Sequence, residues 1–292
     1  MTKHINQSTA PGSLYVVATP IGNLDDLSGR AVAVLKTVAV IAAEDTRRTK
    51  TLLNHYGIKA RRLVSLHEHN ESQRVPALIE TIESGSDVAV VTDAGTPLIS
   101  DPGYRLVSAA GERLINVVSV PGPSAVTAAL SISGLATDRF SFEGFLPSRR
   151  TARRTTLEHL KSETRTLVFF ESARRISECV SDFSDIFGGQ REAALCREMT
   201  KRFESVMRGP LEEISQRLSG ASEEVKGEIV LVVSGSSQPV DRPQVNETLL
   251  LRLLADVLPP RQASEIAARV TGGRKNDLYQ RLLDLEDPGA KS

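Results

Sequence analysis

Short apolar runs alternate with amphipathic segments over the first part of the chain. The runs are continuous in hydrophobic character and rich in β-branched residues, as is typical of strands buried on both faces of a parallel sheet. They predict strands at residues 14–18, 38–43, 62–66, 87–91 and 115–120. Helices are predicted at residues 28–37, 49–56 and 71–85, the last beginning near Pro76 because proline suits a first helical turn. The pattern predicts an N-terminal α/β domain at residues 14–135 with a mostly parallel sheet.

The pattern changes beyond residue 135. Apolar runs predict strands at residues 139–145, 166–172, 192–198, 203–209 and 228–233, with helices at residues 176–187 and 211–218. The run FESVMRG alternates between apolar and polar residues, as an antiparallel strand does. We therefore expect a second α/β domain with a mixed sheet at residues 136–237. Three short helical patterns follow a polar linker at residues 236–244, and they predict a small helical extension at residues 245–288.

Composition narrows the class of protein. Hydrophobic residues make up 40% of the 292 residues and charged residues 25%, which is globular composition. Lys+Arg and Asp+Glu both number 36, so no overall charge attracts a polyanion. Residues 1–13 are polar and predict a disordered tail, and no apolar run reaches the ~20 residues that span a bilayer. Two cysteines define no disulfide framework. We expect a cytoplasmic protein that is not bound to membranes.

Three predicted strands end in loops rich in glycine and proline. The loops are TPIGN, DAGTP and PGPSA, and parallel strands place such loops at one edge of the sheet, where ligands bind. The phosphate-binding signatures G-x-x-x-x-G-K-[ST] and G-x-G-x-x-G are both absent from the sequence. The carboxylate of Asp93 would repel a pyrophosphate. A ligand with hydroxyls, an amine or a sulfonium suits these loops better, and S-adenosylmethionine is one candidate among several.

The order of the motifs carries a family resemblance. The chain contains ATPIGNLDDL, IAAEDTR, LHEHNE, DAGTPLISDPG, PGPSA, RFSFEGFLP, FFES, REMTK and KGEIVLVV. In this order they resemble the tetrapyrrole methylase superfamily, and most closely its branch of ribosomal RNA small subunit methyltransferase I, from Leu14 to about Leu283. The resemblance implies a homodimeric two-domain enzyme that binds S-adenosylmethionine between its domains. It also implies methylation of a cytidine ribose 2′-hydroxyl in the decoding region of 16S ribosomal RNA, with the segment GGRKNDLY in a helical extension.

The resemblance also implies which residues bind the cofactor. Ten positions of this sequence match the family's pocket motifs, the last two by position more than by residue type. They are Pro20, Gly22, Asp93, Thr96, Ile99, Ser124, Ala125, Phe170, Cys196 and Gly227.

Transfer to a ribose hydroxyl requires a group that accepts the hydroxyl proton. Acids at strand ends are the candidates, and the catalytic residues are expected among Glu44, Asp45 and Glu171. Glu198, beside Lys201, belongs to a second set of candidates. Asp101 is a further candidate, but its position before Pro102 favours a helix cap. The sequence leaves the identity of the base open.

A local cluster of arginines indicates how RNA would bind. Residues 139–202 contain 13 Lys+Arg and 9 Asp+Glu, a net charge of +4. Phosphate contacts are expected from Arg149, Arg150, Arg153, Arg154 and Lys201, with a solvated linker as the alternative interpretation.

Three functions stay open at this point. The first is an enzyme acting on 16S ribosomal RNA or the small ribosomal subunit. The others are a small-molecule methyltransferase of the tetrapyrrole type and a non-catalytic ribosome assembly factor. His67 and His69 lie two positions apart, but no third ligand with metal spacing accompanies them, so we expect no metal.

Overall fold

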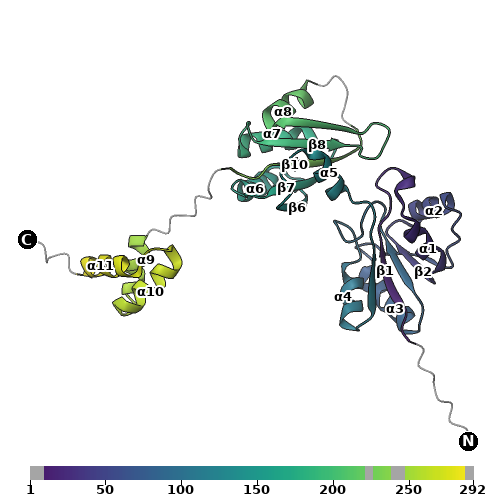
Figure 1. The fold of residues 1–292 in the computed structure, drawn as a ribbon, viewed down its shortest axis with the longest axis horizontal. Helices are drawn as coiled ribbons and strands as arrows, with labels where there is room; N and C mark the ends of the chain where they lie inside the picture. The colour runs from purple at the N-terminus through teal and green to yellow at the C-terminus, as the bar shows by residue number, and fades with distance from the viewer. Residues whose placement is uncertain (1–9, 221–225, 238–246, 287–292) are drawn as a thin grey trace, which may run out of the picture. The chain divides into compact units, whose positions relative to one another are not determined.

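The computed structural model describes residues 10–220, 226–237 and 247–286, which form parts of two compact units, Met1–Ser236 and Ser237–Ser292 (Figure 1). Residues 1–9 of the predicted tail and residues 238–244 of the predicted linker lie outside the described residues. Ser13, the last residue of the predicted tail, already belongs to the first strand.

The first sheet of the larger unit is entirely parallel. Its strands lie in the order β3-β2-β4-β1-β5. They are β1 (Ser13–Val17), β2 (Val40–Ala43), β3 (Leu63–Ser65), β4 (Val88–Val91) and β5 (Asn116–Val120). None of them contains a charged residue, and the central strands β2 and β4 are buried at every position. This arrangement confirms the predicted parallel α/β sheet.

Helices cover both faces of this sheet. They are η1 (Leu24–Asp26), α1 (Gly29–Thr37), α2 (Thr46–His55), α3 (Glu71–Glu83) and α4 (Tyr104–Glu112). Successive residues of β4 point to opposite faces, so Val88 and Val90 pack with α3 and α4, while Ala89 and Val91 pack with α1 and α2. The expected start of α3 near Pro76 is wrong. The amide of Arg74 already donates to the carbonyl of Asn70, so the first turn precedes the proline.

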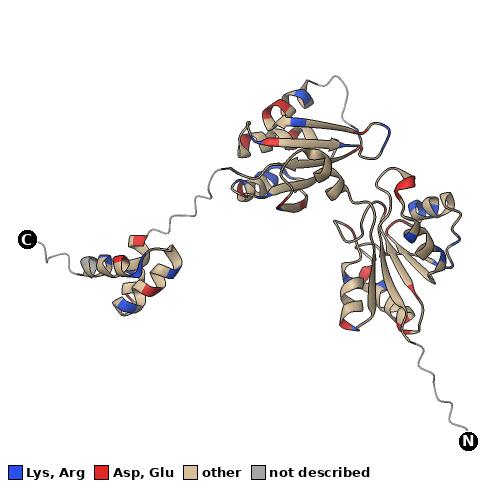
Figure 2. Cartoon of the chain, in the orientation of Figure 1, with Lys and Arg blue, Asp and Glu red and all other residues tan. Residues whose placement is uncertain are grey.

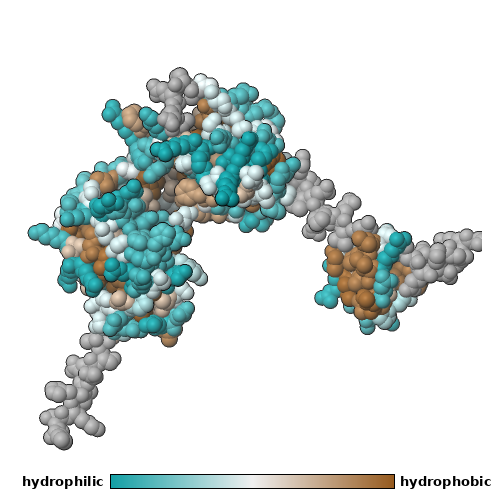
Figure 3. Space-filling model, turned by 180° about the vertical axis from the view of Figure 1, so that it is seen from behind, coloured by the Kyte–Doolittle hydropathy of each residue, from teal (hydrophilic) through white to brown (hydrophobic). Residues whose placement is uncertain are grey.

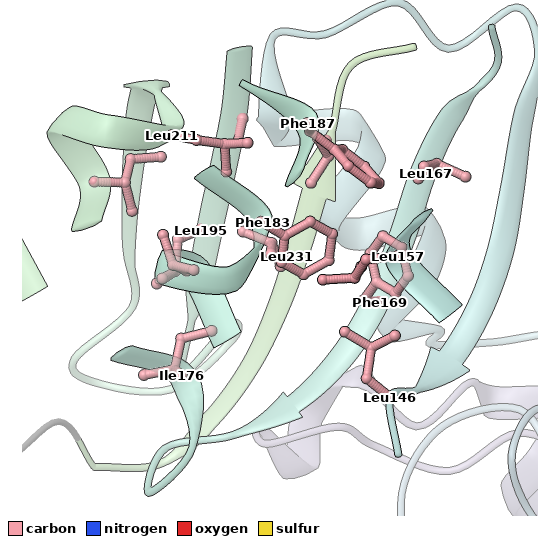
Figure 4. Packing of buried hydrophobic residues seen from close by; sticks show 14 of the residues in the cluster. Leu146, Leu157, Leu167, Phe169, Ile176, Phe183, Phe187, Leu195, Leu211 and Leu231 are labelled. Atoms are coloured by element: carbon pink, nitrogen blue, oxygen red, sulfur yellow. The ribbon is translucent and has the colours of Figure 1, made fainter. Parts of the chain in front are cut away.

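The second sheet is mixed, as predicted. Its order is β6-β7-β10-β8-β9, in which β6 and β7 are parallel and the other pairs antiparallel. The strands are β6 (Phe140–Phe145), β7 (Thr166–Ser172), β8 (Glu192–Arg197), β9 (Ser205–Pro210) and β10 (Glu228–Val233). One face packs against α6 (Arg150–Leu160), α7 (Ile176–Phe187) and α8 (Leu211–Ser219). Figure 4 shows the centre of this core, where the rings of Phe169 and Phe183 meet edge to face at 4.9 Å between centroids.

The opposite face of the second sheet packs against α5 (Ala125–Ser133), the helix that follows β5 of the first sheet. Val126, Ala129 and Leu130 of α5 lie in one buried cluster with Val168 of β7 and Val230 of β10. The predicted range 14–135 assigned this helix to the N-terminal domain, whereas its packing places it on the second sheet. Because α5 connects the two sheets directly, the loop before it lies at their junction.

The smaller unit is a three-helix cluster. It contains α9 (Glu247–Ala255), α10 (Pro260–Thr271) and α11 (Lys275–Glu286) around a core of Leu251, Ala263, Ala267, Leu278 and Leu282. Apolar side chains are also exposed on this unit, among them Leu253, Val257 and Val270. Figure 3 shows hydrophobic residues gathered over one face of it.

Charged residues lie mainly on helices and loops, with both signs interspersed (Figure 2). In the part of the chain that the structure describes, no helix is both long and apolar enough to cross a membrane.

Candidate active site

The three glycine- and proline-rich loops are joined to one another by hydrogen bonds. Thr19 and Gly95 exchange backbone hydrogen bonds of 2.9 and 3.0 Å, which connects the loops after β1 and β4. The hydroxyl of Thr96 donates to the carbonyl of Pro123 at 3.0 Å, which connects the loops after β4 and β5. Gly95 has a φ of +89°, a conformation that side chains disfavour. The carboxyl edge of the first sheet therefore forms one continuous floor.

Two loops that border this floor contain residues in the left-handed region. Leu98 and Ser100 have φ values of +73° and +66° in the loop after β4. Glu198 and Thr200 have φ values of +52° and +66° in the loop after β8. Such conformations cost about 1–3 kcal/mol each and cluster at functional sites. Because strained residues lie on loops from both sheets, this region is the candidate functional site of the larger unit.

The loop after β8 is fastened to its surroundings on both sides. The Thr200 hydroxyl accepts a hydrogen bond of 3.0 Å from the amide of Asn23 in the loop after β1. Glu198 Oε1 accepts bonds of 2.8 Å from Lys201 Nζ and 3.0 Å from the Glu228 amide. A Cβ atom at Gly227, whose φ is +98°, would lie 2.2 Å from Glu198 Oε1. Only glycine therefore fits beside this carboxylate.

These elements enclose a cavity of about 420 Å³, a size typical of small-ligand sites. The wall from the first sheet and α5 is Ile21, Glu44, Arg48, Asp93, Ala94, Gly95, Thr96, Ile99, Ser100, Asp101, Ser124 and Ala125. The wall from the second sheet is Phe145, Phe170, Glu171, Ser172, Met199, Gly227, Glu228, Ile229 and Val230. The cavity thus combines apolar side chains with several carboxylates.

Three carboxylates, Glu44, Asp93 and Asp101, converge on the first wall. Glu44 Oε2 accepts hydrogen bonds from the Thr92 hydroxyl at 2.6 Å and the Asp93 amide at 3.2 Å. Burial, and then the charge of Glu44, raise the pKa of Asp93, whose carboxylate also faces Arg48 at 3.3 Å. Burial raises the pKa of Asp101 to about 6; a hydrogen bond with Thr92 opposes the shift, and the charges of Glu44 and Asp93 add to it. Asp101 is therefore a cavity-lining acid that titrates near pH 6.

The interpretation of Asp101 as a helix cap is wrong. Helix α4 begins after Gly103, which has a φ of +118° and provides no side chain for the cap. Its free amides are satisfied by Glu71, a buried residue of α3. Glu71 Oε1 accepts bonds of 2.9 Å from the Gly103 amide and 3.2 Å from the Arg105 amide. A residue about thirty positions away thus takes the capping role, and Asp101 lines the cavity instead.

The other predicted catalytic acids differ in their surroundings. Glu44 and Glu171 line the cavity, and Asp45 is absent from its lining. Asp45 caps α2, and the bidentate guanidinium of Arg47 is the main reason that the pKa of Asp45 lies far below its usual value. Glu171 is buried, lies 3.2 Å from Arg175 and contacts Cys179 Sγ at 2.9 Å. Its oxygens are therefore already engaged within the protein.

Seven of the ten predicted cofactor residues line the cavity: Asp93, Thr96, Ile99, Ser124, Ala125, Phe170 and Gly227. The remaining three lie outside its lining. Cys196 is buried against α5, and this burial raises the pKa of its thiol to about 11. Gly22 permits close approach, since a Cβ atom there would lie 2.5 Å from Lys201 Cγ, and Pro20 is buried in the same loop. The cofactor contacts of all ten residues stay predictions.

The arginine cluster is organised around a buried acid. Asp182, on α7, is fully buried and accepts hydrogen bonds from Arg150 Nε at 3.0 Å, Arg153 Nε at 2.8 Å and Arg154 Nη1 at 2.7 Å. Burial disfavours its charge, but these bonds keep the pKa of Asp182 below its usual value. The side chain of Arg153 is only 1% exposed, which contradicts its prediction as a phosphate contact. The solvated-linker alternative also fails for Arg153, whereas Arg149 and Arg150 are exposed to solvent.

Lys201 is also occupied, by Glu198 and by Glu228 at 3.1 Å. Among the described residues, no group of three side chains of the metal-binding types is arranged to hold an ion. Sequence reasoning passed over Arg48, Phe145 and Met199, which also line the cavity. The available sequence signal for Phe145 was its place in the motif RFSFEGFLP.

Comparisons with known proteins identify the family. Residues 13–215 match the model of the tetrapyrrole (corrin/porphyrin) methylases, and residues 247–286 match the RsmI C-terminal HTH domain. Two solved structures share the fold. Diphthine synthase has a TM-score of 0.57 and 16% identity over 78% of this chain and 92% of its own. Uroporphyrin-III-C-methyltransferase from Thermus thermophilus has a TM-score of 0.51 and 21% identity over 76% and 94%.

Curated relatives are more similar. The protein named ribosomal RNA small subunit methyltransferase I in Xylella fastidiosa (strain Temecula1) is 49% identical over 93% of this chain and 99% of its own length. The protein of the same name in Escherichia coli O157:H7 is 43% identical over 98% and 100%. The chain therefore belongs to the tetrapyrrole methylase family, and within it to the group of ribosomal RNA small subunit methyltransferase I.

Proposed function

We propose that this chain transfers the methyl group of S-adenosylmethionine to the ribose 2′-hydroxyl of a cytidine in the decoding region of 16S ribosomal RNA. Membership of the family supports the donor and the class of substrate. The observation that carries the proposal for a hydroxyl acceptor is Asp101, a cavity-lining carboxyl group whose pKa of about 6 suits a base.

The residues of the cavity fit S-adenosylmethionine. Ile21, Met199 and Val230 offer apolar surface for its adenine and methylene groups. The carboxylate of Asp93 suits its amine and sulfonium, and the glycines of the floor let backbone amides approach its polar groups. When bound, the cofactor supplies an electrophilic methyl group on a sulfonium. A pyrophosphate would instead meet three converging carboxylates.

Asp101 serves as the proton acceptor in this proposal. At pH 7 a carboxyl group with a pKa of about 6 is mostly ionised, so it can take the proton of a ribose hydroxyl. Burial holds the pKa of Asp101 above that of an exposed aspartate, and the charges of Glu44 and Asp93 add to this shift. A raised pKa makes the carboxylate a stronger base while leaving it charged at neutral pH.

The features that favour an RNA substrate lie outside the cavity. The helical unit at residues 247–286 matches a helix-turn-helix domain type, a class of module that binds nucleic acid. Arg149 and Arg150 are the members of the arginine cluster that are exposed to solvent and can contact phosphates. A homodimer is part of this proposal and rests on the resemblance alone. Light scattering at micromolar concentration tests it, and a mass of 31.6 kDa would contradict it.

Radiolabelled methyl transfer tests the function. Wild-type protein is incubated with labelled S-adenosylmethionine and with small ribosomal subunits, naked 16S RNA or a porphyrinogen. Label in 16S RNA, with one phosphodiester bond made resistant to alkali, is the expected result. Label in the porphyrinogen supports the small-molecule alternative, and RNA binding without transfer supports the assembly factor. Asp101→Asn protein is the matched control, expected to bind the cofactor and to lose transfer.

A further inference from the structure

Phe145 is an exposed aromatic residue in the lining of the cavity. Its side chain is 60% exposed, whereas neighbouring apolar residues of the lining such as Ile229 and Val230 are buried. Burial of a phenylalanine side chain stabilises a fold by ~1.5–3 kcal/mol, and an exposed ring loses part of this stabilisation. A large apolar surface kept open at a pocket is typical of a ligand-binding position.

The backbone of β6 is distorted in a way that presents this ring. Phe142 pairs with Val168 of β7, but the next pair is Gly144 with Phe169, so Glu143 is an extra residue in a β-bulge. Bulges re-aim side chains and are rare between parallel strands. Gly144 has a φ of +66°, which favours glycine.

The bulge changes the face on which Phe145 lies. In a regular strand Phe142 and Phe145, three positions apart, would point to opposite faces. With the extra residue, Phe145 pairs with Phe170 and shares the face of Phe142 and Phe170, toward the cavity. Without it, Phe145 would lie on the face of Phe169, in the closed core under α6 and α7.

Neighbouring rings fix the orientation of Phe145. Its ring meets that of Phe170 edge to face, with centroids 5.6 Å apart, and Phe170 meets Phe142 in the same manner at 4.8 Å. This contact engages one part of the ring and leaves the rest of it in solvent. A rigid, half-supported aromatic surface at a cavity can receive a planar ligand by stacking.

Phe145 also lies near the proposed base. A Cβ atom on Gly144 would lie 3.3 Å from Ser100 Oγ, so β6 and the loop after β4 approach closely here. Gly144 directly precedes Phe145 and Ser100 directly precedes Asp101. Phe145 and Asp101 each lie one residue from the contact between Gly144 and Ser100, so the ring can contact the base of a nucleotide while the carboxylate contacts its ribose.

We propose that Phe145 is the stacking surface for the nucleobase of the RNA nucleotide that is methylated. The inference rests on the proposed function and deepens it, because it requires the target nucleotide to be turned out of any base stack. Single-stranded bases are held in this way on aromatic side chains. The adenine of the cofactor is a second planar ligand with the same chemistry, and the experiments separate the two.

Tryptophan fluorescence provides a direct readout, because the chain contains no tryptophan. Phe145→Trp introduces a single reporter at the cavity, and Phe140→Trp places one on the same strand outside the cavity lining. After subtraction of the signal that the same subunits give with the tryptophan-free wild type, we expect small ribosomal subunits, added after saturation with S-adenosylhomocysteine, to quench the reporter at position 145 and to leave that at position 140 unchanged. Full quenching of the tryptophan at position 145 by S-adenosylhomocysteine alone would overturn the proposal, because it would show that the ring stacks on the adenine of the cofactor.

Kinetics provide the second arm. A stacked base contributes about 1–3 kcal/mol, so Phe145→Ala should lower kcat/KM for the RNA about five- to 150-fold. Phe145→Tyr should retain most of the activity, and Phe140→Ala, which removes another exposed ring of β6, should match wild type. Calorimetry should give wild-type cofactor affinity for Phe145→Ala.

The outcomes distinguish this inference from the proposed function. Failure of wild-type protein to methylate small subunits, with quenching intact at position 145, contradicts the reaction but supports the stacking surface. Normal kcat/KM in a folded Phe145→Ala variant contradicts the stacking surface and leaves the reaction standing. Loss of cofactor affinity in that variant contradicts the assignment to the substrate base.

Discussion

Replacing Asp101 by asparagine should abolish most activity and yet stabilise the fold. The substitution keeps the size of the side chain and removes the group that titrates. In the wild type, burial and the charges of Glu44 and Asp93 oppose ionisation of Asp101, so its charged form is held at a cost in stability. The neutral amide avoids that cost but cannot accept a proton.

The magnitude follows from the pKa. Asp101 shifts from 3.8 to about 6, and a shift of about two units corresponds to about 3 kcal/mol. Its partial exposure reduces this, so we expect about 1–3 kcal/mol. Because the folded state holds the proton more tightly than the unfolded state, wild-type stability should decline as pH rises from about 4 to 6. The advantage of Asp101→Asn should therefore grow as pH rises above about 3.8 and be nearly complete above about pH 6.5.

Two assays test this reasoning. Urea unfolding should show a clearly larger gain at pH 8 than at pH 4.5. Methyl transfer should fall at least about 100-fold in the variant, and wild-type kcat/KM should decrease as pH falls through about 6. Asp45→Asn, which changes an acid outside the cavity lining, should keep this acidic limb. A pH-independent change in stability, or an unchanged limb in Asp101→Asn, would refute the role assigned to Asp101.

Three further predictions concern stability and cofactor affinity. Asp182→Asn leaves the buried guanidinium of Arg153 without its buried charged partner, with only the exposed Glu178 at 3.5 Å, and should cost about 3–5 kcal/mol in chemical denaturation; a loss below 1 kcal/mol would contradict a structural role. Gly227→Ala should destabilise the fold by well over the ~1 kcal/mol expected for Gly57→Ala. Both positions have a positive φ, but a Cβ atom would collide with Glu198 at position 227 and would meet open space at position 57. Equal losses would mean that Glu198 moves to make room for the methyl group. Thr96→Val removes the hydroxyl that joins two loops, so it should lower the free energy of unfolding by about 1 kcal/mol and weaken the binding of S-adenosylmethionine about five- to tenfold in calorimetry. Unchanged affinity would show that this hydrogen bond does not shape the cavity.

Much of the fold was accessible from local pattern. Continuous β-branched runs predicted every strand of the first sheet within a few residues. The loops that line the cavity were also accessible, because parallel strands must place their carboxyl-terminal loops at one edge. These features depend on neighbouring residues along the chain, which a single sequence displays.

The roles of individual polar residues were less accessible. Asp101 preceding Pro102 has the local form of a helix cap, and only the distant Glu71 displaces it from that role. The arginines of α6 have the local form of a phosphate-binding patch, and only Asp182 on another helix turns Arg153 inward. Both cases depend on which side chain arrives from elsewhere to form the hydrogen bond.

The sequence by itself determined the alternating strands and helices, the parallel first sheet, the mixed second sheet and the family, because backbone preference and hydrophobic period act over a few residues. Tertiary structure decided that α5 packs on the second sheet, that Asp101 lines the cavity with a raised pKa, and that a bulge directs Phe145 toward it. Burial, charge–charge interaction and strand register arise between segments far apart along the chain. Their outcome is set only when the chain has folded.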